Sequence, residues 1–152
     1  MTDDDTRQAR TDAVRALEGE FSALITHFRR LISENATRVS PGMLPGVYKV
    51  FTTIVRRENV TLSGLADELI ADKGQVSRAV RELESLGLIA RTPDPDDGRS
   101  SILSPTPLGL ERLAAARAPQ EGALLNALDD WSVDDIRNLS RMLRALGTGA
   151  TP

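Results

Sequence analysis

DKGQVSRAVRELESLGL, residues 72–88, has the pattern of a complete amphipathic helix with its own start and stop signals. Asp72 is a typical N-cap residue, and Gln75 can complete a capping box by reaching back to the cap's backbone amide. Gly87 suits the left-handed position just past a helix end, and Leu88 beyond it suits a Schellman motif. The stretch therefore predicts a helix that stops sharply at its C-terminal end.

This helix is expected to have one apolar side and one basic side, because successive residues advance by about 100° around the axis. The apolar side gathers Val76, Ala79, Val80, Leu83 and Leu86. The opposite side gathers Gly74, Ser77, Arg78, Arg81 and Ser85. That side has two arginines and no carboxylate, a composition that favours contact with nucleic acid over an ordinary solvated face.

The composition of the 152-residue chain favours a single domain and excludes several kinds of chemistry. Apolar residues make up 40% of the chain but aromatic residues only 3%, so the core should be mainly aliphatic. The lack of cysteine excludes disulfides and thiolate metal sites, and one histidine argues against a zinc site. No phosphate-binding glycine loop or histidine-centred triad stands out, so we expect no enzyme activity, cofactor or metal.

The charge and hydropathy patterns point to a cytoplasmic protein without membrane contact. No apolar run approaches the roughly 18 residues needed to cross a bilayer. The acidic start, MTDDD, lacks the basic-then-apolar order of a secretion signal. The net charge of −3 does not exclude nucleic acid as a partner. At physiological salt, charges are screened within about 8 Å, so only those on the docking face matter.

Residues 13–39 carry the strongest long-range pattern, an apolar heptad seam on a predicted helix. Its a and d positions are Val14, Leu17, Phe21, Leu24, Phe28 and Leu31, and the stripe also includes Ile25 and Ile32. Such a stripe can pack on the core of its own domain or on a partner helix, and we favour partial use in a dimer. Residues 1–12 show no such period and are expected to form a flexible tail.

The middle of the chain predicts a helix-turn-helix. SPGMLPG, residues 40–46, has two prolines and two glycines and should end the first helix. Apolar spacing marks a second helix that ends near Arg57, and Thr61 can cap a third. The third helix should stop at residues 70–71, so that Asp72 opens the basic helix after a tight turn.

A β-hairpin, which we call the wing, is expected over residues 88–104. Two short strand-like segments flank PDPDDGR, residues 93–99, which is rich in turn-forming residues. Its aspartates suggest a cation-binding loop at first sight, but the spacing of an EF-hand is absent. Turn formation is the better explanation of these residues.

The last part of the chain, residues 106–147, returns to helical spacing. Thr106 can cap a helix in which Pro119 and Gly122 predict either a kink or a break into two helices. Ser132 can cap the final helix, and Gly147 is expected to end it. The final helix repeats the a/d spacing at Ile136, Leu139, Leu143 and Leu146.

Together these features resemble the MarR family of bacterial winged-helix transcription regulators over about residues 13–146. The most specific segment is DPDDGRSSILSPTPLG, residues 94–109, which is similar to that family's Asp-rich turn, arginine, short strand, threonine and glycine. The second is LADELIADKGQVSRAVRELESLGLI, residues 65–89, which looks like the family's helix-turn-helix.

The resemblance implies a mainly α fold with a small β-hairpin wing, in a single domain over residues 13–147. In that domain, residues 45–104 would form a winged helix-turn-helix DNA-binding lobe, and residues 13–39 and 106–147 would form dimerisation helices. The implied function is a homodimeric regulator that binds a pseudo-palindromic site in double-stranded DNA. We expect a repressor released by a small-molecule effector, with a small aromatic acid as the implied class.

The resemblance also assigns roles to residues of the wing. Arg99 matches the family's wing arginine, which enters the minor groove, and Asp97 matches an aspartate that holds the wing together through ion pairing. Gly98 departs from the family, whose members often have a basic residue there. This departure and the net acidity leave an alternative open, a winged-helix protein–protein interaction module without DNA binding.

The expected DNA contacts combine the basic helix, its surroundings and the wing: Ser63, Lys73, Gly74, Gln75, Ser77, Arg78, Arg81 and Arg99. Arg78 and Arg81 can fork onto guanine or pair with phosphate, and the sequence does not separate these roles. Gln75 can contact a base edge or be used in the capping box. His27, Arg30 and Trp131 are candidates for an effector pocket, although ordinary surface or packing roles would also explain them.

Overall fold

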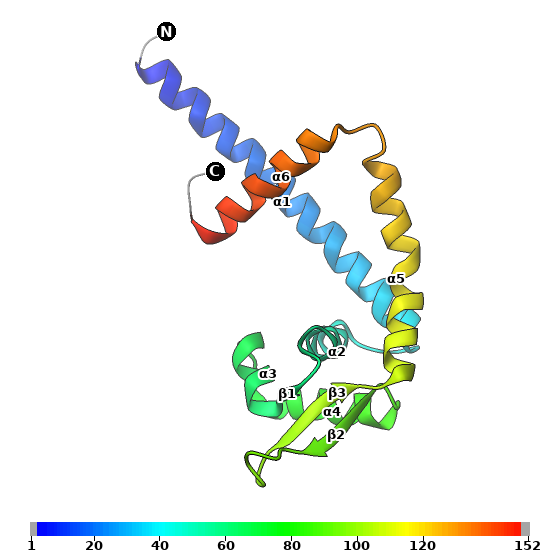
Figure 1. The fold of residues 1–152 in the computed structure, drawn as a ribbon. Helices are drawn as coiled ribbons and strands as arrows, with labels where there is room; N and C mark the ends of the chain where they lie inside the picture. The colour runs from blue at the N-terminus through cyan, green and yellow to red at the C-terminus, as the bar shows by residue number, and fades with distance from the viewer. Residues whose placement is uncertain (1–2, 150–152) are drawn as a thin grey trace. The chain divides into compact units, whose positions relative to one another are not determined.

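The computed structural model describes residues 3–149, which form six helices and three strands (Figure 1). In chain order these are α1 (Asp3–Val39), α2 (Pro45–Arg57), β1 (Val60–Thr61), α3 (Leu62–Leu69), α4 (Lys73–Ser85), β2 (Ile89–Pro93), β3 (Ser101–Pro105), α5 (Pro107–Ala127) and α6 (Val133–Thr148). The chain divides into two compact units, with the boundary between Ala116 and Arg117. The mainly α fold with a small β-hairpin is as the sequence predicts.

The lobe formed by α2, α3, α4 and the three strands has an aliphatic core. Its largest fully buried side chains are Phe51, Ile54, Leu65, Leu83, Leu88 and Leu103. Burial of one such side chain contributes roughly 1.5–3 kcal/mol, so these residues provide much of the lobe's stability. Because the core draws on every element from α2 to β3, it fixes the exposed faces of α3 and α4 relative to each other.

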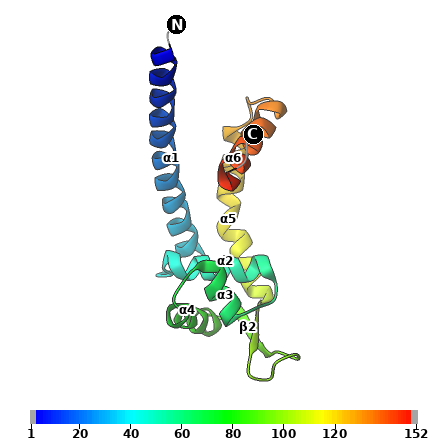
Figure 2. The ribbon, with the colours of Figure 1, turned by 90° about the vertical axis from the view of Figure 1, so that its left-hand side faces the viewer.

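The sheet is antiparallel with the strand order β1-β3-β2. In β3, Leu103 lies opposite Arg91 of β2 on one side and Val60 of β1 on the other. The wing therefore consists of β2, β3 and their connecting turn, and Figure 2 shows it extending beyond the helices of the lobe. Strand β1 was not predicted, because two residues are too few to show a strand pattern.

Helix α1 is longer than the sequence predicts, because it begins at Asp3 and includes most of the expected tail. Residues 1 and 2 of that tail lie outside the described part of the chain. Side-chain pairs one helical turn apart support the added segment: Gln8 donates to Asp12 over 3.1 Å, and Arg7 lies 4.0 Å from Asp4. The prediction relied on apolar periodicity, and this segment is held by polar pairs instead.

At the other end of α1, Ala36 and Val39 are buried in the core of the lobe. The heptad seam before them remains exposed, with Phe28 at 52% of its full accessibility. The seam residues at least 39% exposed are Val14, Leu17, Leu24, Ile25, Phe28 and Ile32. Only the end of α1 therefore packs on the lobe's core, and most of the stripe does not.

The C-terminal region contains two helices, α5 and α6, whose extents can be compared with the prediction. Helix α5 is a single helix with Pro119 inside it, so the expected kink or break does not divide it into two. Helix α6 begins at a Ser132 cap, as predicted, but does not end at Gly147. It continues through Thr148, and Gly149 takes the left-handed cap with φ of 67°. Both glycines permit a helix end, and the second one provides it.

Candidate nucleic-acid interface

Helix α4 begins at the predicted N-cap. The Asp72 carboxylate accepts a hydrogen bond from the Gln75 backbone N–H over 3.0 Å. The reciprocal half of the capping box is not formed, because the Gln75 side-chain amide makes no hydrogen bond within residues 3–149. Its donor and acceptor are therefore free to meet a ligand.

Gly74 has a steric role in this start. A Cβ atom at Gly74 would lie 3.0 Å from the carboxylate oxygen of Asp72 that forms the cap. That distance is tighter than ordinary van der Waals contact. Glycine thus leaves room for the cap and keeps this end of the helix open to a close approach.

Replacement of Asp72 by alanine is expected to lower the free energy of unfolding by about 1 kcal/mol, because the first turn loses its side-chain acceptor. Urea unfolding measures this change. The matched control is Asp67→Ala on α3, which removes an exposed carboxylate that is not a helix cap and should change stability by less than about 0.5 kcal/mol. Equal losses in the two variants would contradict the role of the cap.

The C-terminal end of α4 is a Schellman motif, as predicted. The N–H of Leu88 donates to Leu83 O over 3.0 Å, and the N–H of Gly87 donates to Glu84 O over 2.9 Å. Gly87 has φ of 72°, in the left-handed region. This end directs the chain into β2 and so places the wing directly after the helix.

The two faces of α4 are also as the sequence predicts. Val76, Ala79, Val80 and Leu83 are buried, whereas Gln75, Arg78 and Arg81 are exposed. Arg81 donates to the hydroxyl of Ser77 over 3.3 Å, which orders the middle of the exposed face. Arg78 has no ion pair or hydrogen bond from its side chain within the described chain. Its guanidinium group can therefore bind an anion or a base without first breaking another contact.

Lys73 and Ser63 lie together at the start of α4, where the helix-turn-helix brings α3 beside it. The Lys73 ammonium donates to the Ser63 hydroxyl over 2.9 Å. A positive charge here adds to the positive end of the helix dipole, which is the arrangement that favours a phosphate. Lys73 and Ser63, both predicted as DNA contacts, thus form one local group.

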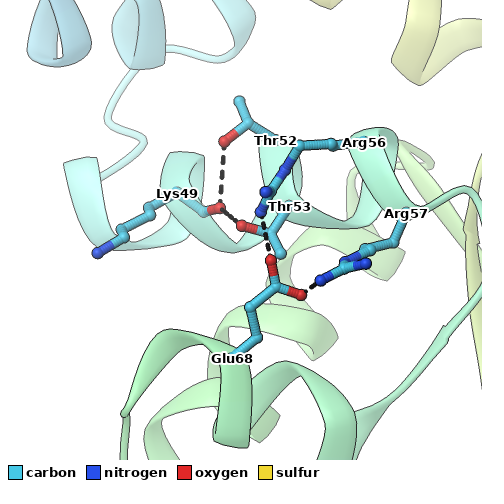
Figure 3. Close-up of polar contacts among 6 residues, drawn as sticks. All are labelled: Lys49, Thr52, Thr53, Arg56, Arg57 and Glu68. Atoms are coloured by element: carbon cyan, nitrogen blue, oxygen red, sulfur yellow. Dashed lines mark hydrogen bonds and ion pairs between the residues drawn. The ribbon is translucent and has the colours of Figure 1, made fainter. Parts of the chain in front are cut away.

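An ion-pair cluster that the sequence analysis missed holds α3 against α2 (Figure 3). The Glu68 carboxylate accepts from Arg57 Nε over 2.8 Å and also pairs with Arg56 Nη2. The hydrogen bond from Arg57 is the main reason that the pKa of Glu68 is lowered, while partial burial acts in the opposite direction. Arg56 and Arg57 share the one carboxylate of Glu68, which offsets one of their two positive charges and engages both side chains, so they are weaker candidates for DNA contact than Arg78.

The turn of the wing is built by its aspartates. The Asp94 carboxylate accepts from Asp96 N–H over 2.9 Å, and the Asp97 carboxylate accepts from Arg99 N–H over 3.0 Å. Among the described residues Asp97 forms no ion pair, so the expected ion-pairing role is replaced by a backbone hydrogen bond. Arg99 is exposed, and its guanidinium group forms no ion pair or hydrogen bond within residues 3–149.

The start of α5 closes on the connection between α4 and the wing. The Thr106 hydroxyl donates to Gly87 O over 2.6 Å and accepts from Gly109 N–H over 3.0 Å. The Thr106 backbone N–H donates to Leu88 O over 3.0 Å. Gly109 is buried against this connection, and an added Cβ would overlap Leu88 O and lie 3.0 Å from the carbonyl carbon of Leu88. We call this contact of residues 87–88 with residues 106–109 the α5 junction.

Residues 45–101, from the start of α2 to the first residue of β3, match the model of the MarR family. Over these residues the chain is similar to the MarR family. A curated relative, an uncharacterised HTH-type transcriptional regulator (YdgJ) of Bacillus subtilis strain 168, is 25% identical over 95 residues. That match spans 62% of this chain and 58% of the relative, less than two thirds of the relative's length.

Solved structures share the fold over most of this chain. The MarR family transcription regulator SP03579 is 20% identical, with a TM-score of 0.80 over 94% of this chain and 93% of its own. A mutant of MarR from E. coli, crystallised in complex with operator DNA, is 21% identical with a TM-score of 0.61. The shared region covers 84% of this chain and 91% of the E. coli one.

The residues predicted for an effector pocket belong to both compact units of the chain. His27 and Arg30 are exposed on α1, and the His27 ring lies 6.3 Å from the ring of Phe28. Trp131 belongs to the second unit and is 46% exposed. A hollow of about 410 Å³ borders α2 and α4 instead, and its lining includes Gln75 and Arg78 but none of those three residues. It belongs to the candidate interface.

Two further features are absent from the described residues. Within residues 3–149, no helix has both the length and the apolar character to cross a bilayer. Over the same residues, no group of three histidine, cysteine or acidic side chains is arranged to hold a metal ion.

Proposed function

We propose that this chain is a sequence-specific regulator of transcription that binds double-stranded DNA as a homodimer. The observation that carries the proposal is the exposed face of α4, where Gln75 and Arg78 have free side chains. A second free arginine, Arg99, stands in the wing that follows the same helix. A winged helix with unpaired cations at both positions has the charge and hydrogen-bonding groups that a duplex needs.

In this proposal α4 enters the major groove. Arg78, Arg81 and Gln75 provide forked donors or an amide, the groups that pair with guanine and adenine edges. Ser77 lies beside Arg81 on the same face. The group formed by Lys73 and Ser63 contacts phosphate at the positive end of α4, and the missing side chain of Gly74 allows the backbone to approach closely.

Arg99 has a different task in the proposal. The minor groove is narrow and strongly negative in some sequences, and a single arginine inserted there reads its width rather than a base pattern. The Asx turn made by Asp97 holds the backbone of Arg99 and leaves its guanidinium free. Because Gly98 adds no second cation, we assign most of the wing's electrostatic contribution to Arg99.

The homodimer is proposed from the unpartnered apolar faces of two helices. On α1 the heptad seam is exposed, and on α6 the exposed residues include Leu146 at 58% of its full accessibility. Large exposed apolar stripes are costly in water and typical of helices that pair with another chain. We therefore assign residues 13–39 and 106–147 to dimerisation and residues 45–104 to DNA contact.

We further propose that the dimer acts as a repressor released by a small aromatic acid. A dimer with two DNA lobes binds a pseudo-palindrome only when its two α4 helices are about 34 Å apart, one turn of B-DNA. A ligand that fits another spacing better would shift the population away from the DNA-bound form. His27, Arg30 and Trp131 remain the proposed candidates for such a ligand. The proposal includes no catalytic step.

In-vitro selection of duplexes with the purified full chain tests the function. The expected result is enrichment of a pseudo-palindrome whose half-sites lie about 10 base pairs apart, centre to centre. Light scattering on the unbound protein should give the mass of two chains. A selection that enriches no sequence, from protein shown to be folded by circular dichroism, would contradict the proposal.

A further inference from the structure

Glu84 and Arg91 form an ion pair between two different elements, in which both nitrogens that make contact belong to one arginine. Glu84 lies in the last turn of α4, and Arg91 lies in the middle of β2. Arg91 Nε lies 3.0 Å from Glu84 Oε1, and Arg91 Nη2 lies 3.0 Å from Glu84 Oε2. This two-pronged geometry fixes the orientation of both side chains, unlike a single contact between flexible groups.

The position of Arg91 in the sheet lets the pair hold the wing against α4. Strand β2 is an edge strand, because the order is β1-β3-β2 and its only neighbour in the described sheet is β3. At the far end of the wing, the hydrogen bonds of residues 94–100 run within the turn, such as Asp94 N–H to Ser100 O at 3.1 Å. The wing tip is thus oriented from its base, where Arg91 ties the edge strand to α4.

Both side chains of the pair are also partly shielded from solvent. The exposed fraction is 30% for the Glu84 side chain and 37% for that of Arg91. The hydrogen bond to Glu84 raises the pKa of Arg91. Arg91 differs here from Arg78 and Arg99, whose side chains have no protein partner in the described residues.

From these contacts we infer that Glu84 and Arg91 are positioning residues, which set the wing relative to α4 so that Arg99 and Arg78 reach one duplex together. The inference rests on the proposed function and deepens it. The same pair could instead act only by neutralising Arg91. The two roles predict opposite changes in duplex affinity for Glu84→Gln. If the pair positions the wing, affinity should fall; if it only neutralises Arg91, affinity should rise, because the substitution removes one negative charge and frees one arginine near the DNA.

The test measures fluorescence anisotropy with two labelled duplexes, the one selected by the wild-type chain and a scrambled version. Positioning predicts that Glu84→Gln lowers the affinity for the selected duplex about tenfold, as coupled pairs typically do. The affinity for the scrambled duplex should stay equal or rise slightly, because that binding depends on charge alone. Specificity, the ratio of the two affinities, is the readout that a loss of stability alone would not change.

The matched control is Glu82→Gln, which removes the same charge from the same helix. Glu82 is exposed, and its carboxylate forms no ion pair among the described residues. It should therefore leave the ratio of affinities unchanged. An equal effect of Glu82→Gln and Glu84→Gln, or tighter binding of the selected duplex by Glu84→Gln, would overturn the inference and favour simple charge neutralisation.

A double variant gives a second test. If the pair positions the wing, Arg99→Ala should cost less affinity in the Glu84→Gln background than in the wild type, because the wing is already misplaced. Additive losses would contradict the inference.

Hydrogen exchange on the free protein supplies a readout that needs no DNA, and Glu84→Gln should speed exchange in β2 and β3. If the wild type bound no duplex, the proposed function itself would be wrong. Unchanged hydrogen exchange of β2 and β3 in Glu84→Gln would separately reject the effect of the pair on the wing.

Discussion

Replacement of Gly109 by alanine is expected to lower the free energy of unfolding by about 3 kcal/mol or more, because a methyl group has no space at the α5 junction. The added Cβ would overlap Leu88 O and lie 3.2 Å from the Cα of Leu88, both atoms of the main chain. Backbone atoms cannot move aside as a flexible side chain can. The first turn of α5 must then separate from the end of α4, which would also break the hydrogen bonds of Thr106.

Chemical denaturation of Gly109→Ala, monitored by circular dichroism, measures this loss. Small domains are stable by only about 5–15 kcal/mol, so the shift should be large and easily detected. Gly122→Ala is the matched control on the same helix, since a Cβ there meets no atom within 4 Å. It should stabilise the chain by roughly 0.5–1 kcal/mol, because alanine favours the helix. Similar effects of the two substitutions would contradict the claim that residue 109 has no space for a methyl group at the α5 junction.

The second large effect is expected at the two unpaired arginines of the proposed interface. Arg78→Ala should cost about 1–3 kcal/mol of binding free energy and relax the base preference at one position of each half-site. Arg99→Ala should weaken binding strongly through the wing and reduce the salt dependence by about one phosphate-equivalent contact per half-site, which is about two per dimer. Neither residue forms an ion pair within the described chain, so neither substitution should destabilise the fold.

Binding titrations with the selected duplex and with single-base variants of it measure both effects. Arg112→Ala, which removes an exposed arginine from α5, controls for the loss of one positive charge. It should change the affinity much less than either interface variant. Unchanged affinity in Arg78→Ala and Arg99→Ala together would exclude these residues from the DNA contact.

The parts of this structure that depend on local sequence could be predicted. The caps at Asp72, Thr106 and Ser132 and the Schellman end at Gly87 are all formed. Each involves a few neighbouring residues whose chemistry determines the backbone. The same holds for the buried and exposed faces of α4, which follow from helical periodicity. These features were sufficient to predict the candidate interface and the winged-helix lobe.

The features that the sequence did not reveal depend on residues that are distant along the chain or on a choice between equivalent signals. The cluster of Glu68 with Arg56 and Arg57 becomes visible only when α3 packs on α2. The tight space at Gly109 depends on a backbone carbonyl 21 positions earlier, at Leu88. The end of α6 moved from Gly147 to Gly149 because both residues suit a helix end, and sequence alone does not rank them.

The salt dependence of duplex binding tests the central claim, that the face of α4 and the wing form a DNA-binding surface, most directly. Affinity for the selected duplex should fall linearly on a log–log plot against salt concentration, with a slope of about −0.9 for each phosphate contact. The slope for the dimer should correspond to several contacts and become shallower in Arg99→Ala. Absence of any salt-dependent duplex binding by the folded dimer would contradict the claim and favour a protein–protein interaction module.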